Sequence, residues 1–197
     1  MASATDSPSY TERLVKLENA WWKKLLPVQA PYKAHLRSLK LGFVLDIGCG
    51  LGRNLLHLHR SGVGVDHNSQ SIETARSAGV DAYLADDFLR SRWSKGAQFD
   101  SLLLSHILEH MDAISASNLI QSYLPYLRPN GRIVMLCPQS AGFASDPTHV
   151  TYFDNESLMK LAKSLGLLID RSYSFPFPQW VGKYFKYNEF VVIARKP

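Results

Sequence analysis

The sequence predicts an α/β protein whose mostly parallel sheet is covered by helices on both faces. Short apolar runs alternate with stretches of helical spacing through most of the 197 residues, and this alternation is typical of right-handed strand–helix–strand units. The last two apolar runs have no helix between them, so one strand of the closing pair is expected to be antiparallel. The length fits one domain with a short appendage.

Seven apolar runs have the length and composition of strands. They cover residues 43–48, 63–66, 80–85, 99–105, 132–137, 167–175 and 189–195. Helical spacing is found between most of them, over residues 52–60, 69–79, from about 106, 115–127 and 155–166. A turn is expected at RPNG, residues 128–131. The helix over 155–166 has the clearest end signals, because Asp154 can cap its first turn and Gly166 can end it.

The first 41 residues form a separate unit in this scheme. Apolar residues recur there at helical spacing, until Pro27 and Pro31 interrupt the pattern. We predict an N-terminal helical lid over residues 1–41, followed by the main domain over residues 42–197.

The formal net charge of +5 comes from the two ends of the chain. Residues 1–41 hold seven Lys and Arg against three acids, and residues 171–197 hold five against one, so each end carries +4 and the middle carries −3. Basic residues are not densely interleaved with aromatic ones, which argues against a nucleic-acid partner.

The sequence also bears on location. No apolar run reaches the roughly 18 residues of a membrane span, and the N-terminus has no secretory pattern. Both cysteines lie in or beside apolar runs, as reduced core thiols do. We therefore expect a cytoplasmic protein.

Three glycines follow the first predicted strand on alternate positions, in LDIGCGLGRN. Gly48, Gly50 and Gly52 let the backbone approach a ligand, because they have no Cβ atom. In an open parallel sheet such a loop lies at the carboxyl ends of the strands, where ligands bind. Asp66 ends the second strand, and a carboxylate there can accept hydrogen bonds from both hydroxyls of a ribose. The pattern therefore predicts a ligand that contains adenosine.

Two residues distinguish between the adenosine ligands. A dinucleotide-binding loop has the spacing G-x-G-x-x-G, but Arg53 stands where the third glycine belongs. Asp46 precedes the loop, and its carboxylate would repel a pyrophosphate but could pair, directly or through water, with the ammonium of an amino acid. S-Adenosylmethionine has an adenosine, an ammonium and no phosphate, so it is the predicted cofactor.

Five segments in this order resemble the motifs of the class I S-adenosylmethionine-dependent methyltransferases: VLDIGCGLGRNL, VGVDHN, AYLADDF, FDSLLLSHILEHM and LRPNGRIVMLCP. The resemblance covers about residues 42–195. It implies a Rossmann-like, mostly parallel sheet of seven strands in the order 3-2-1-4-5-7-6, with strand 7 antiparallel. It also implies that Asp86 binds the adenine amino group. The implied cofactor-binding residues are Asp46, Gly48, Cys49, Gly50, Gly52, Asn54, Asp66, His67, Asp86, Asp87, Phe88 and Ser105.

Three other functions stay open. HILEH, from His106 to His110, matches the H-x-x-E-H signature of inverted zinc peptidases, whose two histidines share one helical face. The glycine loop leaves an NAD-dependent dehydrogenase as a second alternative. A methyltransferase-like protein without catalysis is the third.

Methyl transfer to a hydroxyl needs a base, whereas an amine often needs only to be placed in line with the methyl group. His106 follows the fourth strand and His149 lies in the loop after the fifth, and both are predicted catalytic residues. His149 is the favoured base, because a loop residue can approach the acceptor from the side away from the sulfur. Glu109, His110 and His149 are also candidate ligands of a divalent cation such as magnesium.

Aromatic residues near both ends of the chain are predicted to line the acceptor pocket, since flat amphipathic rings suit sugars or aromatic ligands. They are Tyr10, Trp22, Tyr32, Tyr152 and Trp180. YTERLVKLENAWWKKLLPVQAPY also resembles short bacterial methyltransferases that act on methylmannose polysaccharides. The preferred prediction is O-methylation of a sugar or polysaccharide-precursor hydroxyl, with N-methylation of a small amine as the alternative. The expected partner is a small-molecule or saccharide acceptor, and a homodimer is allowed.

Overall fold

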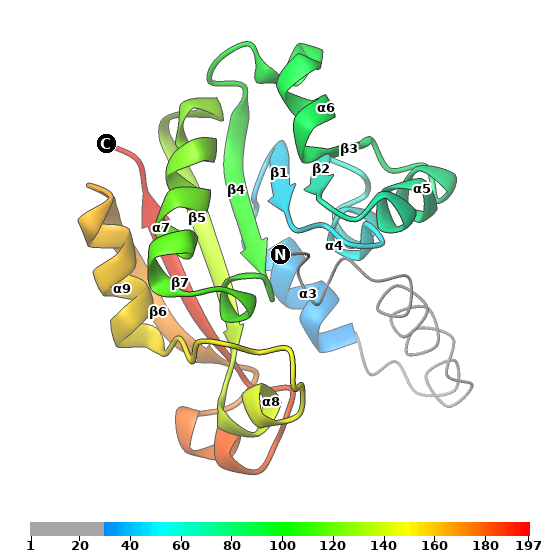
Figure 1. Ribbon diagram of the computed structural model, residues 1–197. Helices are drawn as coiled ribbons and strands as arrows, with labels where there is room; N and C mark the ends of the chain where they lie inside the picture. The colour runs from blue at the N-terminus through cyan, green and yellow to red at the C-terminus, as the bar shows by residue number, and fades with distance from the viewer. Residues whose placement is uncertain (1–29) are drawn as a thin grey trace.

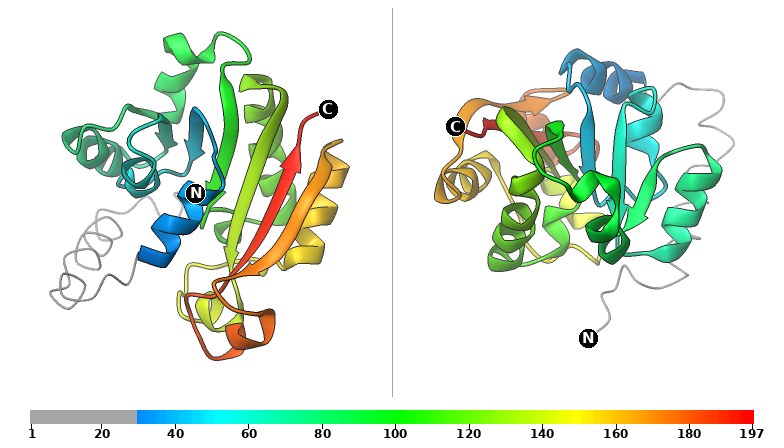
Figure 2. Two further views of the ribbon diagram at one scale, coloured as in Figure 1. Left: turned by 180° about the vertical axis from the view of Figure 1, so that it is seen from behind. Right: turned by 90° about the horizontal axis from the view of Figure 1, so that it is seen from above.

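A computed structural model describes residues 30–197, with one mixed sheet between two layers of helices (Figure 1, Figure 2). Most of the predicted lid, with Tyr10 and Trp22, lies outside the described residues. Every helix within residues 30–197 is too short or too polar to span a bilayer.

The sheet of the described residues has seven strands in the order β3-β2-β1-β4-β5-β7-β6. The strands are β1 (Val44–Ile47), β2 (Gly62–Asp66), β3 (Ala82–Leu84), β4 (Phe99–Ser105), β5 (Leu127–Pro138), β6 (Leu168–Phe175) and β7 (Glu189–Arg195). Neighbours from β3 to β5 are parallel, and β7 pairs antiparallel with both β5 and β6. The predicted strand order and the antiparallel seventh strand are confirmed.

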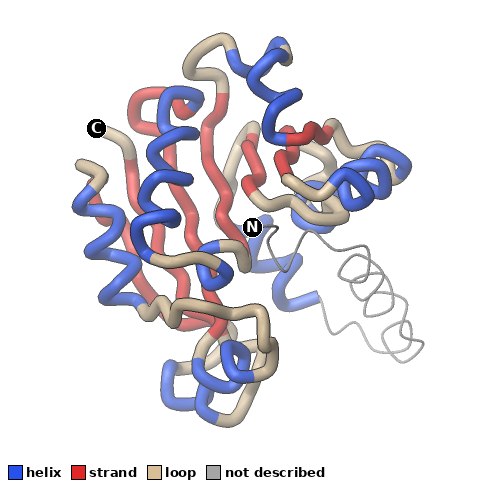
Figure 3. The backbone as a smooth tube through the Cα atoms, viewed as in Figure 1, coloured by secondary structure: helices blue, strands red, loops and turns tan. Residues whose placement is uncertain are grey.

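Helices cover both faces of this sheet (Figure 2). On one face lie α3 (Ala30–Ser38), α4 (Arg53–His57) and α5 (Ser69–Ser77). On the other lie α6 (Ala85–Arg90), α7 (Ala113–Tyr123) and α9 (Asn155–Ser164). The short α8 (Ser140–Ala144) follows the carboxyl end of β5 and lies, with the loop between β6 and β7, beyond that end of the sheet (Figure 3). The remaining helical turns are 3-10: η2 (Arg92–Ser94), η3 (Leu108–His110), η4 (Leu124–Tyr126) and η5 (Gln179–Lys183).

The core explains why the central strands are continuous apolar runs. Alternate residues of a strand point to opposite faces, so Leu102 and Leu104 of β4 pack with α7 while Leu103 packs with the α3, α4 and α5 layer. Both faces are covered by helices, and both sets of side chains are therefore apolar. The predicted ends of α9 are also confirmed, because Asp154 accepts a hydrogen bond from the Ser157 N–H at 2.8 Å and Gly166 has a left-handed backbone.

The chain after β4 differs from the predicted helix. His106 has a left-handed backbone, with φ of 57°, and only the 3-10 turn η3 follows before α7 begins. α7 starts at Ala113, two residues earlier than predicted, because Asp112 caps it by accepting a hydrogen bond from the Ser115 N–H at 2.8 Å. The HILEH residues therefore lie on a tight turn and not along one face of an α-helix.

One segment that contains proline also differs from prediction. RPNG does not separate a helix from β5 but bulges within the strand: Leu127 pairs with Phe99 and Arg132 with Ser101. Pro31 lies in the first turn of α3, and the helical pattern that it was predicted to interrupt lies outside the described residues. A proline is tolerated there because the first N–H groups of a helix have no helical partner.

Candidate active site

The glycine loop connects β1 to α4 at the carboxyl end of the sheet. A Cβ atom on Gly48 would overlap Cδ1 of Ile107 and lie 3.1 Å from its Cβ, and the φ of +74° is one that L residues rarely adopt, so a side chain is strained at this position. Gly50 also has a left-handed backbone, with φ of 50°, but the position of its missing Cβ has no atom within 4 Å. The loop is therefore packed on its inner side and open above Gly50, which leaves room for a ligand.

Asp66 ties this loop to the end of β2. Its Oδ2 accepts a hydrogen bond from the Gly50 N–H at 2.8 Å, and its Oδ1 accepts one from the Asn68 N–H at 2.9 Å. The Nδ1 atom of His67 lies 3.5 Å from the same Oδ1. Each carboxylate oxygen can accept more than one hydrogen bond, so Asp66 keeps the capacity to accept from ribose hydroxyls.

Asp46 and Asn54 lie beneath the loop. Nδ2 of Asn54 donates to Oδ1 of Asp46 at 3.3 Å, whereas Oδ2 of Asp46 is buried without a hydrogen-bond partner. Burial raises the pKa of Asp46 to about 7, against the opposing hydrogen bond from Asn54. A buried carboxylate with one free oxygen is costly unless a donor or a cation satisfies it. The predicted ammonium of an amino acid would do so.

Cys49 and Phe88 differ from the other predicted cofactor residues, because their side chains belong to the core. The thiol of Cys49 packs against Gly64, and burial raises its pKa well above the ordinary value. The ring of Phe88 is fully buried and contacts the rings of Phe99 and Tyr126. The side chains of both residues are excluded from a cofactor site, which leaves only their backbone groups.

Asp86 and Asp87 lie in the first turn of α6, at the end of β3. Asp86 is exposed, and Asp87 pairs with Arg90 at 2.8 Å. The side chain of Asp86 is therefore accessible to an adenine, as the resemblance implies.

Tyr32 was predicted to line the acceptor pocket, but the structure brings it to the cofactor residues. Its hydroxyl lies 3.0 Å from Oδ1 of Asn54 and 2.8 Å from Oγ of Ser105, at the end of β4. Sequence reasoning missed this because Tyr32 belongs to α3, which precedes the first strand.

His106 lies between two buried acids at the end of β4. Its Nε2 lies 2.6 Å from Oε1 of Glu189, and its Nδ1 lies 3.3 Å from Oε1 of Glu109. Burial lowers the pKa of His106, but the charges of Glu189 and Glu109 outweigh this effect and raise it to about 10. His106 therefore keeps its proton near neutral pH, which does not suit a general base.

Glu189 was missed by sequence reasoning. It is the first residue of β7 and pairs in register with Pro138, the last residue of β5. Its side chain is buried, and Oε2 has no hydrogen-bond partner. The available signal was an acid at the start of the apolar run EFVVIAR, although such a residue is more often a solvated strand end.

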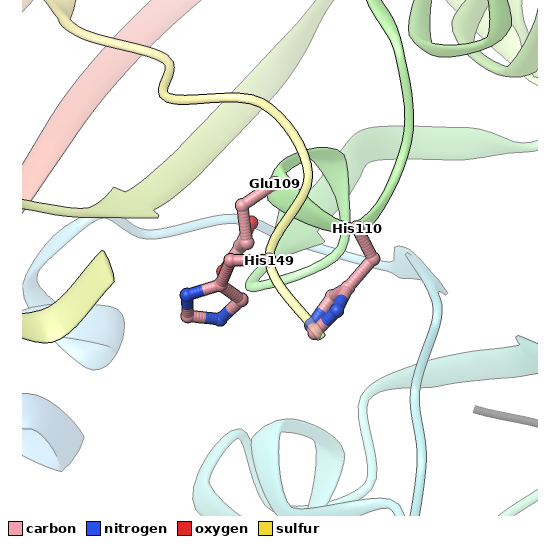
Figure 4. Close-up of side chains that lie close together, drawn as sticks. All are labelled: Glu109, His110 and His149. Atoms are coloured by element: carbon pink, nitrogen blue, oxygen red, sulfur yellow. The ribbon is translucent and has the colours of Figure 1, made fainter. Parts of the chain in front are cut away.

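Glu109, His110 and His149 form a cluster after β4 and β5 (Figure 4). One potential ligand atom of each residue lies within 4.8 Å of the others. Burial acts to raise the pKa of Glu109, but the adjacent His106 outweighs it, so the pKa lies below its ordinary value and the carboxylate is ionised. The Glu109 oxygens are buried, and the described residues offer them no geometric hydrogen bond, although Oε1 pairs with Nδ1 of His106 at 3.3 Å.

The hydrogen bonds of the two histidines define their tautomers. Nδ1 of His149 lies 2.8 Å from the Phe143 carbonyl, and Nδ1 of His110 lies 3.2 Å from the Thr148 carbonyl. A carbonyl oxygen only accepts, so both Nδ1 atoms donate, and each neutral ring has a lone pair on Nε2. Burial lowers the pKa of His110. The cluster thus presents one carboxylate and two imidazole lone pairs.

This arrangement excludes the histidine pairing of a zinc peptidase. His106 faces Glu189 and Glu109, whereas His110 faces Thr148 and packs edge-on against His149, with ring centroids 4.9 Å apart. The two HILEH histidines do not share one helical face, because η3 is a 3-10 turn.

Of the remaining predicted aromatic residues, Tyr152 lies in the loop between α8 and α9, and Trp180 lies between β6 and β7. The hydroxyl of Tyr152 lies 3.2 Å from Oγ of Ser140, and Trp180 is 68% exposed in the loop between β6 and β7. Asn188 holds this loop, because its Oδ1 accepts from the Phe177 N–H at 2.9 Å. Further aromatic side chains are exposed in the same loop: Phe177, Tyr184, Phe185 and Tyr187.

The fold recurs among solved structures of low identity. A SAM-dependent methyltransferase from Archaeoglobus fulgidus matches with a TM-score of 0.66 and 22% identity, over 84% of this chain and 93% of that chain. The magnesium protoporphyrin IX methyltransferase of Synechocystis, with bound SAH, matches with a TM-score of 0.66 and 13% identity, over 98% and 96%. The [4+2]-cyclase SpnF also matches, with a TM-score of 0.64 and 19% identity, over 84% and 80%. The fold alone therefore does not define the reaction.

The sequence itself matches a family of methyltransferase domains over residues 22–171. No curated protein sequence matches the chain. Because the family match spans most of the chain and the fold agrees with it, the chain belongs to this methyltransferase-domain family and is a class I S-adenosylmethionine-dependent methyltransferase.

Proposed function

We propose that the chain transfers the methyl group of S-adenosylmethionine to a hydroxyl of a sugar or a polysaccharide precursor. The observation that carries this proposal is the tautomer of His149. Its Nδ1 donates to the Phe143 carbonyl, so Nε2 keeps a lone pair that can accept a proton, and His149 belongs to the same cluster as Glu109. A hydroxyl acceptor needs such a base, whereas an amine acceptor does not.

In the proposed reaction the acceptor oxygen attacks the methyl carbon in line with the sulfur. A C–O bond forms as the C–S bond breaks, and the electron pair of that bond leaves S-adenosylhomocysteine neutral at sulfur. The hydroxyl proton passes to Nε2 of His149 and then to water. His106 contributes as a protonated group that holds Glu109 and Glu189, not as the base.

The cofactor is proposed to lie across the carboxyl ends of β1 to β3. Asp66 accepts from the ribose hydroxyls, the loop from Gly48 to Gly52 lies under the methionine part, and Asp46 faces the ammonium. Asp86 reaches the adenine amino group. The remaining predicted residues, His67, Asn54, Asp87 and Ser105, border these groups.

A divalent cation is a second way to activate the hydroxyl, favoured by the donor set of Glu109, His110 and His149. One carboxylate and two imidazoles suit several divalent metals, and the three potential ligand atoms lie close together. A bound cation would lower the pKa of a coordinated hydroxyl.

The acceptor class rests on the resemblance to polysaccharide methyltransferases and on the exposed rings of Tyr152 and Trp180. Flat rings of this kind stack against sugar faces. The N-terminal lid, a homodimer and a cytoplasmic location stay predictions.

The test uses the full chain, methyl-labelled S-adenosylmethionine and a panel of neutral glycosides, amino sugars and small amines. We expect mass spectrometry to find the label on oxygen. Label found on nitrogen alone would contradict the proposal and favour the amine alternative. Repeating the assay after EDTA, with and without added magnesium, separates the two ways of activation. Activity that EDTA removes and magnesium restores would favour the cation, and activity that survives EDTA would favour His149 alone.

A further inference from the structure

Helix α3 lies before the strand–helix alternation, yet it contributes a hydroxyl to the cofactor end of the sheet. The Tyr32 hydroxyl lies 2.8 Å from Oγ of Ser105 and 3.0 Å from Oδ1 of Asn54. Asn54 in turn donates through Nδ2 to Oδ1 of Asp46 at 3.3 Å. A continuous chain of hydrogen bonds therefore joins the end of β4 to the end of β1.

The direction of each bond follows from its chemistry. The carboxylate of Asp46 accepts, so the amide NH₂ of Asn54 faces it and the amide oxygen faces Tyr32. That oxygen only accepts, so the single proton of Tyr32 points to Asn54 and Ser105 must donate to Tyr32. Burial raises the pKa of Tyr32 far above its ordinary value, so this proton is always present.

The chain ends on an unsatisfied group. Oδ1 of Asp46 accepts from Asn54, and Oδ2 is buried with no hydrogen-bond partner among residues 30–197. The neighbouring loop is open above Gly50. Asp46 therefore holds one fixed oxygen, buried next to the glycine loop, to which the described residues offer no hydrogen bond.

We propose that Tyr32 is a positioning residue for the methionine end of the cofactor. It holds Asn54, Asn54 orients Asp46, and Oδ2 of Asp46 then receives the α-ammonium. This inference rests on cofactor binding at the glycine loop and is independent of the acceptor.

The structure supplies a matched control on the same helix. His35, one turn after Tyr32, contacts the Tyr173 hydroxyl through Nε2 at 2.7 Å and stacks on Phe175. Tyr173→Phe removes a hydroxyl that anchors α3 but leaves the chain from Ser105 to Asp46 intact. Tyr32→Phe removes only the hydroxyl in that chain.

Comparing the binding of two ligands shows whether Tyr32 positions the cofactor or only stabilises the fold. S-Adenosylhomocysteine has the α-ammonium, whereas 5′-methylthioadenosine keeps the adenosine and lacks the amino acid. By calorimetry we expect Tyr32→Phe to lower the affinity for S-adenosylhomocysteine about tenfold, which corresponds to about 1.4 kcal/mol of binding free energy. We expect it to leave 5′-methylthioadenosine within about twofold, because the lost hydrogen bonds act only on the methionine end. Tyr173→Phe should leave both affinities within about twofold.

A double-mutant cycle tests whether Tyr32 acts through Asp46. In the Asp46→Asn background, adding Tyr32→Phe should weaken the binding of S-adenosylhomocysteine by less than about twofold. The effects of substitutions in one hydrogen-bond network are not additive. If Tyr32→Phe lowers the melting temperature enough to prevent calorimetry, Ser105→Ala interrupts the same chain from its other end and should give the same ligand selectivity. Unchanged affinity for S-adenosylhomocysteine, or equal weakening of both ligands, would overturn the proposal.

Discussion

The proposed cofactor end, at β1 to β3, and the proposed acceptor end, at β4 and β5, lie along one edge of the same sheet but are built differently. At the cofactor end, Gly50 binds Asp66 across only 16 residues, within a single strand–loop–helix–strand unit. At the acceptor end, His106 contacts Glu189 across 83 residues, and His110 contacts Thr148 across 38. The first region is defined by a local motif, and the second exists only where separate loops meet.

The two ends also differ in their charge balance. Among the residues that the structure describes, none offers Oδ2 of Asp46 a hydrogen bond or an ion pair, and we propose that a ligand completes the cofactor end. At the acceptor end, the carboxylates of Glu109 and Glu189 flank His106. The charge of the protonated His106 ring therefore compensates most of the cost of burying these two carboxylates. Substitutions at the acceptor end should therefore affect turnover and stability, and those at the cofactor end should affect ligand binding.

The largest expected effect is on turnover. His149→Ala removes the proposed base, so kcat should fall by about 100-fold or more, with the affinity for S-adenosylhomocysteine unchanged. The assay uses the best acceptor of the glycoside panel.

The control for this substitution is His59→Asn, an exposed residue with a left-handed backbone that asparagine tolerates. Near-normal turnover in His149→Ala would show that placement alone drives the reaction.

The next effect is on stability at the acceptor end. Glu189→Gln keeps the shape of the side chain but removes the charge that holds His106. We expect the free energy of unfolding, from urea denaturation, to fall by about 2 kcal/mol. This is less than for a fully buried pair, because His106 is 37% exposed. Asp170→Asn breaks the more exposed pair with Arg195 and should cost less than about 1 kcal/mol.

The pH dependence of stability sharpens this test. The pKa of His106 is raised from 6.5 to about 10 in the folded protein, so its contribution is complete below pH 6.5 and is lost as the pH rises through 10. The stability difference between wild type and Glu189→Gln should therefore shrink over that range. A constant difference would mean that His106 is not the partner that matters.

A smaller effect is expected on cofactor affinity. Asp66→Ala should weaken S-adenosylhomocysteine by at least about tenfold, because charged hydrogen bonds to the ribose are lost. Asp66→Asn keeps one accepting oxygen, so its affinity for S-adenosylhomocysteine should lie between those of Asp66→Ala and the wild type. Unchanged binding in Asp66→Ala would remove the ribose assignment.

The smallest effect is on the pH dependence of binding. Burial raises the pKa of Asp46 from 3.8 to about 7, so the free protein loses stability as the pH rises from 3.8 through 7. An ammonium favours the ionised carboxylate, so affinity for S-adenosylhomocysteine should be lower at pH 6 than at pH 8, by up to about tenfold. Calorimetry at both values, with Asp46→Asn as a variant that should show no such change, checks this.

Much of the fold and of the cofactor end could be predicted because the signals are local. The alternation of apolar runs with helical spacing follows from helices that bury both faces of a parallel sheet. The glycines, Asp46 and Asp66 lie within one such unit, so their spacing in the chain already indicates their arrangement in space. The exceptions, Cys49 and Phe88, lie within these motifs, but their side chains point into the core.

The strand order could be predicted through the resemblance, and the chemistry of the cofactor from the glycine loop with Asp46 and Asp66. The contacts at the proposed acceptor end became visible only in the folded structure. β7 lies between β5 and β6, which brings Glu189 to His106 and makes that histidine a cation instead of a base. The Phe143 carbonyl sets the tautomer of His149, and α3 carries Tyr32 to Asn54. The contact between His106 and Glu189 joins residues 83 apart, and that between Tyr32 and Asn54 joins residues 22 apart. Both depend on where the strands and α3 lie in the finished sheet, so their spacing in the chain does not encode them. The contact between Phe143 and His149 spans only six residues, but it depends on the conformation of their loop.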